Sequence, residues 1–207
     1  MDFRLFSDRT MCVVGPTHSG KTSFVMALLE QRHQLFHTPP HRVVWCYGQY
    51  QAELHTRMRD KGFELRAGLM DTKDILPNDL IVLDDLLHES ESSSSVTSTF
   101  TRVAHNKPCF VIFITQNLYP RGKEARTRSL NVHYFVLMKN PRDKAQINVL
   151  AHQMLPRHSK AFVEMYEDAT QAPHSYLFVD LTQECPEEHR FRAKLFEPPM
   201  ILYKLQY

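Results

Sequence analysis

Short apolar runs alternate with segments of helical spacing along this chain of 207 residues. Runs of β-branched and aromatic residues bounded by turn signals predict strands, and apolar residues four apart predict amphipathic helices. Strands are predicted at about Thr10–Val14, 42–47, 62–66, 80–83, 108–115, 132–138 and 175–181, with a basic and apolar alternation at 190–196 that suits an edge strand. Helices are predicted from 23 to about 33, over 49–61, 97–106 and 158–168, and from a start within 139–143, with Pro141 in the first turn, to 155. This alternation indicates an α/β fold with a central, mainly parallel sheet flanked by helices.

The loop after the first predicted strand has the sequence GPTHSGKT, which matches the phosphate-binding pattern G-x-x-x-x-G-K-T. Glycines let the backbone curl so that its N–H groups point at phosphate, and the following helix start favours negative charge. The lysine can reach the β- and γ-phosphates, and the threonine hydroxyl can bind Mg²⁺. A strand is predicted before this loop and a helix after it. This context favours a phosphate-binding loop over a glycine turn that matches the pattern by chance. The predicted nucleotide-binding residues are Gly15, Pro16, Thr17, His18, Ser19, Gly20, Lys21, Thr22 and Ser23.

Two carboxylates, Asp84 and Asp85, follow the apolar run at 80–83. In a parallel sheet the ligand crevice lies beyond the carboxyl ends of the strands, so both acids are expected there. Asp84 would hold Mg²⁺, directly or through water, and Asp85 would orient or activate the attacking water. The alternative interpretation is an acidic turn after a strand without a catalytic role. The complete phosphate loop in the same chain favours the functional interpretation.

A polar residue also ends the apolar strand at 108–115. Gln116 stands there, in the place where additional-strand P-loop ATPases carry a γ-phosphate sensor. An amide that caps the strand end is the competing interpretation.

Two polar segments allow both a structural and a functional reading. The serine-rich residues 88–98 form either a flexible loop or a loop that contacts a DNA backbone, helped by Arg102 and Lys107. Residues 118–131 carry a basic cluster that is either a solvated face or a source of phosphate contacts, including an arginine finger for a neighbouring subunit. The cluster contains Arg121, Lys123, Arg126 and Arg128.

Composition narrows the class of protein. Hydrophobic residues make up 43% and charged residues 23%, which is typical of a globular chain. The sequence predicts no membrane span and no signal peptide. A net charge of +2 means that nucleic-acid contacts must come from local patches. Four cysteines without a C-x-x-C pair predict reduced, buried thiols of an intracellular protein rather than disulfides or zinc.

The length suits one domain over residues 1–207, with an N-terminal arm at 1–8 and an apolar, aromatic tail at 197–207. The tail either folds on its own core or docks on a partner.

The order of these motifs resembles the FtsK–HerA superfamily of P-loop ATPases, more narrowly the genome-packaging ATPases of Polinton (Maverick) elements, adintoviruses and related DNA viruses. The resemblance spans about residues 10–196. Its most specific parts are WCYG at 45–48, LIVLDD at 80–85, FITQN at 113–117, RT at 126–127 with SLN at 129–131, and KNPRD at 139–143.

The resemblance implies a RecA-like, ATP-hydrolysing double-stranded DNA translocase that forms a homo-oligomeric ring, a hexamer or pentamer, and packages a genome into a capsid. It implies that Lys21 and Thr22 bind ATP and Mg²⁺, that Asp84 binds Mg²⁺, and that Asp85 is the base and Gln116 the sensor. Arg126 and Arg142 are the candidate arginine fingers, with Arg102 behind them. Many members carry Asp-Glu where this chain has Asp84-Asp85.

The implied partners are DNA, further copies of the chain and a capsid or portal-vertex protein, with no membrane. The implied location is intracellular, with the host nucleus favoured over the cytoplasm, or in the virion. Two other functions fit the same motifs: a nucleoside or small-molecule kinase, and a nucleotide-binding structural protein without hydrolysis.

Overall fold

The computed structural model describes residues 2–86, 103, 106–118 and 132–205. The serine-rich segment, most of the helix predicted over 97–106, Arg102 and the basic cluster at 121–128 therefore lie outside the described residues. The helices are α1 (Lys21–Glu30), α2 (Arg32–Leu35), α3 (Ala52–Asp60), α6 (Ala145–Met154) and α7 (Ser159–Ala169), with short 3-10 turns η1 (Thr72–Asp74) and η2 (Glu187–His189). The strands are β1 (Thr10–Val14), β2 (Arg42–Tyr47), β3 (Glu64–Ala67), β4 (Asp79–Asp84), β5 (Phe110–Thr115), β6 (Tyr134–Met138), β7 (Tyr176–Asp180), β8 (Phe191–Ala193) and β9 (Ile201–Tyr203).

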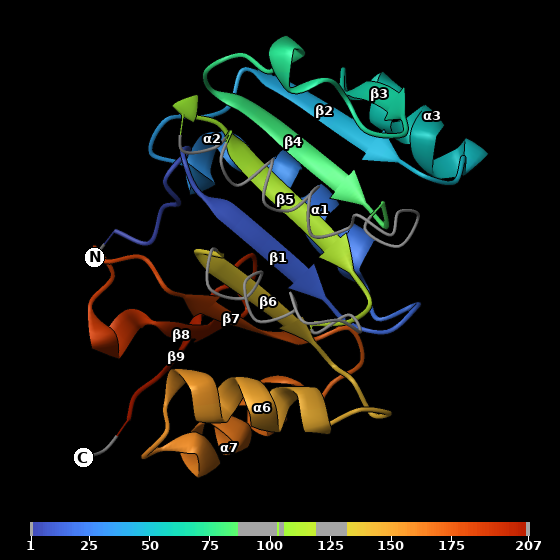
Figure 1. Cartoon of the computed structure of the whole chain (residues 1–207). Helices are drawn as coiled ribbons and strands as arrows, with labels where there is room; N and C mark the ends of the chain where they lie inside the picture. Colours follow the sequence, from blue (N-terminus) through green and yellow to red (C-terminus); the bar gives the residue numbers. More distant parts are fainter. Residues whose placement is uncertain (1, 87–102, 104–105, 119–131, 206–207) are drawn as a thin grey trace.

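All of these strands belong to one nine-stranded sheet in the order β3-β2-β4-β5-β1-β6-β7-β8-β9 (Figure 1). The part from β3 to β6 is parallel, whereas β7, β8 and β9 continue it as antiparallel strands. The predicted α/β fold with a mainly parallel, helix-flanked sheet is thus confirmed. Strand β5 lies between β1 and β4, which is the arrangement of the additional-strand class.

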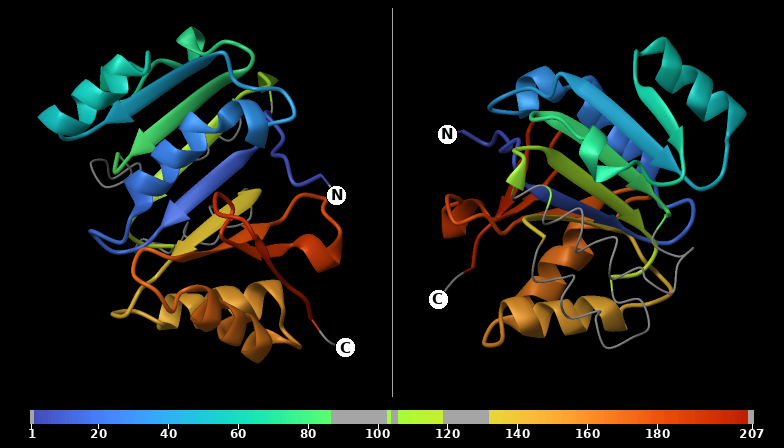
Figure 2. Two further views of the ribbon diagram at one scale, coloured as in Figure 1. Left: turned by 180° about the vertical axis from the view of Figure 1, so that it is seen from behind. Right: turned by 45° about the horizontal axis from the view of Figure 1, so that its top comes forward.

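Successive side chains of each central strand point to opposite faces of the sheet, because the strand is pleated. Met11 and Val13 of β1 pack with α1 on one face, while Cys12 and Val14 pack with α6 and α7 on the other. Figure 1 shows α1 behind the sheet and α6 in front of it, and the left view of Figure 2 shows α1 from its own side. Both faces are covered, which explains why the central strands read as continuous apolar runs.

The carboxyl-terminal strands differ from the sequence-based expectation. The segment at 190–196 was expected to be an edge strand, and this is wrong: β8 lies between β7 and β9. Residues 201–203 of the predicted tail form β9, with Arg192 paired to Leu202, so this part of the tail lies on the chain's own sheet. The interior position suits Arg192, whose guanidinium is 3% exposed and donates to Asp180 at 2.8 Å.

Two helix boundaries also differ. The helix predicted to reach about residue 33 ends at Glu30 and is followed by the separate short α2. The chain turns here because Leu5 forms a parallel bridge with Phe36, and the Leu5 N–H donates to the Leu35 carbonyl at 2.6 Å. The later helix begins at Ala145, after Asp143 accepts its N–H at 3.1 Å. No helix among the described residues is long and apolar enough to cross a membrane.

Candidate functional site

The carboxyl ends of the parallel strands β1, β4 and β5 meet at one edge of the sheet (Figure 1). An open cleft of about 930 Å³ lies there, at the start of α1. Its lining includes loop residues 17–23, both aspartates after the β4 core and the amide after β5, that is Asp84, Asp85 and Gln116. Parallel topology therefore brings together three motifs that are far apart in the sequence.

The loop between β1 and α1 is bonded to the sheet at its start and turns back on itself further along. The Gly15 N–H donates to the Thr115 carbonyl at 3.2 Å, and the Ser19 N–H donates to the Pro16 carbonyl at 3.1 Å. His18 and Gly20 have left-handed φ values of 63° and 99°, so the chain turns tightly before the helix. Glycine is required at the first position because a β-carbon on Gly15 would lie 2.6 Å from Met138 Cβ.

The ammonium of Lys21 is folded back over this loop. Its Nζ donates to the carbonyls of Gly15 at 2.8 Å and of Pro16 at 2.9 Å. Burial lowers the pKa of Lys21, while the charges of Asp85 and Asp84 act in the opposite direction. A cation therefore lies at the centre of the cleft, held beside two acidic residues.

Asp84, the last residue of β4, is oriented by a neighbour from β2. The indole N–H of the fully buried Trp45 donates to Asp84 Oδ2 at 3.3 Å. Burial raises the pKa of Asp84, the hydrogen bond from Trp45 lowers it, and the nearby Asp85 raises it further. A bound cation would counter the burial and the repulsion, so the surroundings of Asp84 suit a metal ligand.

Asp85 and Gln116 form a polar chain across the cleft. Gln116 Nε2 donates to Asp85 Oδ2 at 3.2 Å, and Gln116 Oε1 accepts from the Thr17 hydroxyl at 3.4 Å. Asp85 is exposed and has a φ of 54°, which is uncommon for a residue with a β-carbon. One amide thus contacts both the phosphate loop and the second carboxylate.

The residues present fit a magnesium–nucleotide. Ser19 Oγ is buried in the loop and has no hydrogen-bond partner within the described part of the chain, as suits a group that meets a phosphate oxygen. Thr22 and Asp84 both line the cleft and offer oxygen atoms to a hard cation. No group of three or more His, Cys, Asp or Glu side chains among the described residues suits a metal. Mg²⁺ needs no such cluster, because it commonly uses one or two protein oxygens with phosphates and water.

Arg142, the one candidate arginine finger among the described residues, does not line this cleft. It is exposed in the turn between β6 and α6, where its N–H donates to Asn140 Oδ1 at 3.1 Å. Arg126 and Arg102 lie outside the described residues. A role for any of them in a neighbouring subunit stays a prediction.

Sequence reasoning missed the contribution of Trp45 and of the far end of the cleft. His174, Tyr176, Phe196 and Glu197 line that end, although they lie more than a hundred residues beyond the phosphate loop. No spacing rule links these positions to residues 15–22, because β7 and the segment after β8 reach the cleft only through the order of strands. Trp45 carried a weak signal as part of the WCYG stretch.

Fold and cleft together define the RecA-like, P-loop NTPase class of α/β structures: a phosphate loop after β1, acids after β4 and an inserted β5 that ends in a polar residue. The genome packaging NTPase B204 from Sulfolobus turreted icosahedral virus 2, solved in complex with sulfate, is similar at 9% identity and a TM-score of 0.52, over 98% of this chain and 99% of its own. A KaiC-like protein from the hyperthermophilic archaeon Pyrococcus horikoshii OT3 is similar at 9% identity and a TM-score of 0.51, over 95% of this chain and 90% of its own. Neither a protein-family model nor a curated protein sequence matches the chain. At such identities the likeness defines the fold and not the function.

Proposed function

We propose that this chain is an ATPase that couples ATP hydrolysis to movement of double-stranded DNA, as the packaging subunit of a virus or virus-like element. The observation that carries the proposal is the single cleft in which Lys21, Asp84, Asp85 and Gln116 meet. A bare phosphate loop would support nucleotide binding alone. The second carboxylate and the amide add the groups that water attack requires.

Each side chain has a role that its position supports. Lys21 exchanges its bonds to the loop carbonyls for the β- and γ-phosphates, and the loop N–H groups bind the remaining phosphate oxygens. Thr22 and Asp84 would hold Mg²⁺, which would neutralise charge on the phosphates. Trp45 fixes the orientation of Asp84, since its indole N–H occupies one carboxylate oxygen.

Hydrolysis then proceeds by attack of water on the γ-phosphorus. Asp85 accepts a proton from the water as the new oxygen–phosphorus bond forms and the bond to the β,γ-bridging oxygen breaks, which leaves ADP and phosphate. Gln116 contacts both Asp85 and Thr17, and these two contacts support its role as the γ-phosphate sensor. A cation from a neighbouring copy, with Arg142 and Arg126 as candidates, would stabilise the charge that develops.

Two further observations support the proposed DNA movement and ring assembly. One is the motif order that resembles packaging ATPases, and the other is the fold likeness to a viral genome packaging NTPase over nearly the whole length of both chains. The exposed position of Arg142 is compatible with a head-to-tail ring, in which each copy completes the next site. Capsid or portal contact, and the cellular location, follow from the same resemblance.

The test is the rate of phosphate release from MgATP with and without linear double-stranded DNA. We expect DNA to raise the rate several-fold, and single nucleosides to leave it unchanged. Transfer of the phosphate to a nucleoside would instead show a kinase. ATP binding without turnover, even with DNA, would show a structural nucleotide-binding protein and would overturn the proposal.

A further inference from the structure

The cleft extends past the phosphate loop to a second end that holds no acidic pair and no lysine in its described lining. This end begins at His174, which lies beside Gly20 of the phosphate loop, and continues with Tyr176, the first residue of β7. It is completed by Phe196 and Glu197, which lie between β8 and β9. We propose that it is the nucleoside subsite of the cleft, where Phe196 packs against a purine base. The inference rests on the proposed nucleotide binding and adds which part of the chain recognises the nucleoside.

The direction of the nucleotide follows from the order of strands. Asp84, Asp85 and Gln116 stand at the ends of β4 and β5, on one side of β1. The γ-phosphate must lie on that side, because hydrolysis occurs there. The other phosphates cross the start of α1, so the nucleoside extends towards the side of β6 and β7. Tyr176 belongs to β7, which lies next to β6, and the ring centroid of Phe196 is 6.4 Å from that of Tyr176.

Phe196 is held in place by an aromatic cluster with Phe24 of α1 and Tyr176 of β7. The ring centroids of Phe24 and Phe196 are 5.1 Å apart, and those of Phe24 and Tyr176 are 4.7 Å apart at 79°. The Tyr176 hydroxyl also accepts the Leu195 N–H at 3.0 Å, which ties the segment to the sheet. The wall is therefore preformed, and binding need not order it.

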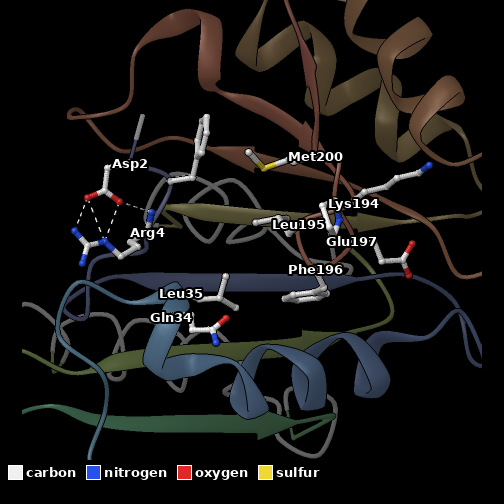
Figure 3. Close-up of a pocket in the computed structure, with 11 residues that line it drawn as sticks. Asp2, Arg4, Gln34, Leu35, Lys194, Leu195, Phe196, Glu197 and Met200 are labelled. Atoms are coloured by element: carbon white, nitrogen blue, oxygen red, sulfur yellow. Dashed lines mark hydrogen bonds and ion pairs between the residues drawn. The ribbon is translucent and has the colours of Figure 1, made fainter.

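The chemistry of this end suits a neutral nucleoside and not a phosphate. Phe196 is half-buried, so part of its apolar surface remains for a base, and aromatic side chains stack with bases of every kind. The carboxylate of Glu197 repels phosphate, but it accepts hydrogen bonds from hydroxyl and amino groups. Figure 3 shows Phe196 above α1 and Glu197 pointing away from Leu35 and Met200.

A second, smaller cavity of about 390 Å³ on the other side of this segment supplies a matched control (Figure 3). Leu195 lines the small cavity and not the cleft, whereas Phe196 lines both. Leu195→Ala and Phe196→Ala therefore remove apolar contacts from the same segment, but only the second changes the cleft. Melting temperatures without ligand measure how far each substitution disturbs the fold.

The experiment is calorimetric titration of the full chain with MgATP and, separately, with magnesium tripolyphosphate, which lacks a nucleoside. We expect Phe196→Ala to weaken MgATP binding roughly tenfold and to leave tripolyphosphate binding unchanged. Leu195→Ala should change neither. Equal weakening of both ligands, or no change in MgATP binding, would overturn the nucleoside subsite.

The same titrations separate this inference from the proposed function. Lys21→Ala should abolish binding of both ligands if the loop binds phosphates. Wild-type protein that binds neither ligand would contradict the proposed function, and with it the subsite. Wild-type protein that binds MgATP, with Phe196→Ala unchanged, would contradict the subsite alone.

Discussion

At the scale of single residues, the cleft depends on neighbours that have no reactive role. Trp45 is fully buried in β2, and its only side-chain polar atom donates to Asp84. A hydrogen bond of this kind fixes the orientation of the carboxylate that we propose as a Mg²⁺ ligand, and loss of such supporting partners commonly weakens metal binding. Trp45 is therefore expected to matter for Mg²⁺ although it does not line the cleft.

The first prediction is that Trp45→Phe raises the Mg²⁺ concentration needed for half-maximal ATP hydrolysis by roughly tenfold. The substitution keeps an aromatic ring in the core but removes the N–H that orients Asp84. Magnesium titrations of the hydrolysis rate measure the shift. An unchanged magnesium requirement in a folded variant would show that Asp84 needs no such support.

The second prediction concerns Gly15. In Gly15→Ala the new β-carbon would lie 2.6 Å from Met138 Cβ and 2.7 Å from Ser19 Oγ, so the loop must shift. We expect a stability loss of about 1–3 kcal/mol in urea unfolding and a large loss of ATP binding.

Gly62→Ala is the matched control, because Gly62 also has a positive φ, 77°, but nothing lies within 4 Å of its β-carbon position. It should lose about 1 kcal/mol from backbone strain and keep ATP binding. If Gly15→Ala bound ATP as well as Gly62→Ala does, close packing of the loop against β6 would not be needed for ATP binding.

At the scale of elements, α7 supports the sheet beside the phosphate loop. The Tyr166 hydroxyl donates to the carbonyl of Met138, the last residue of β6, at 2.9 Å and accepts the Asn140 N–H at 2.9 Å. Burial raises the pKa of Tyr166, so the phenol stays protonated and keeps donating. One side chain on α7 thus holds the strand end that Gly15 contacts.

The third prediction is that Tyr166→Phe lowers the free energy of unfolding by about 1–3 kcal/mol, because the buried Met138 carbonyl and the partly buried Asn140 N–H lose this partner. Tyr203→Phe is the control: its hydroxyl donates to Asp168 at 2.7 Å at an exposed position, so water can replace it. Its loss should stay below about 1 kcal/mol. Urea unfolding measures both, and equal losses would refute the structural role given to Tyr166.

Most helices and strands of this fold could be predicted from the sequence, but the pairing of some strands could not. The strands β1, β2, β4 and β5 follow from apolar runs, and the acids after β4 follow from position, because these signals are local. The interior place of β8 could not be predicted, since it depends on pairing with Ile201–Tyr203 after a separate turn. Phe196 and His174 were missed for the same reason: no local pattern says which strand lies beside β6.

At the scale of the whole molecule, the sheet is covered on both faces and its thiols are inaccessible. All four cysteines are buried thiols, as predicted. Burial raises the pKa of Cys46 to about 11 and that of Cys109 to about 12. A raised pKa means less thiolate at neutral pH, and thiolate is the reactive form.

The fourth prediction is that native protein reacts slowly with a disulfide reagent at pH 7.5, whereas four thiols react at once in strong denaturant. The rate in native protein should follow global or local opening of the sheet rather than pH alone. Rapid reaction of Cys46 or Cys109 in native protein, located by peptide mapping, would contradict the burial of β2 and of the start of β5.

The proposed ATP hydrolysis depends on Asp85 as the base, and a matched pair of proteins tests this role. Phosphate release from MgATP is measured for wild type and Asp85→Asn with linear double-stranded DNA present, alongside MgATP affinity. We expect Asp85→Asn to bind MgATP with little change in affinity but to lose at least a hundredfold in the rate of phosphate release. Equal rates in the two proteins would contradict it, because a cleft that hydrolyses ATP without Asp85 does not work as described here.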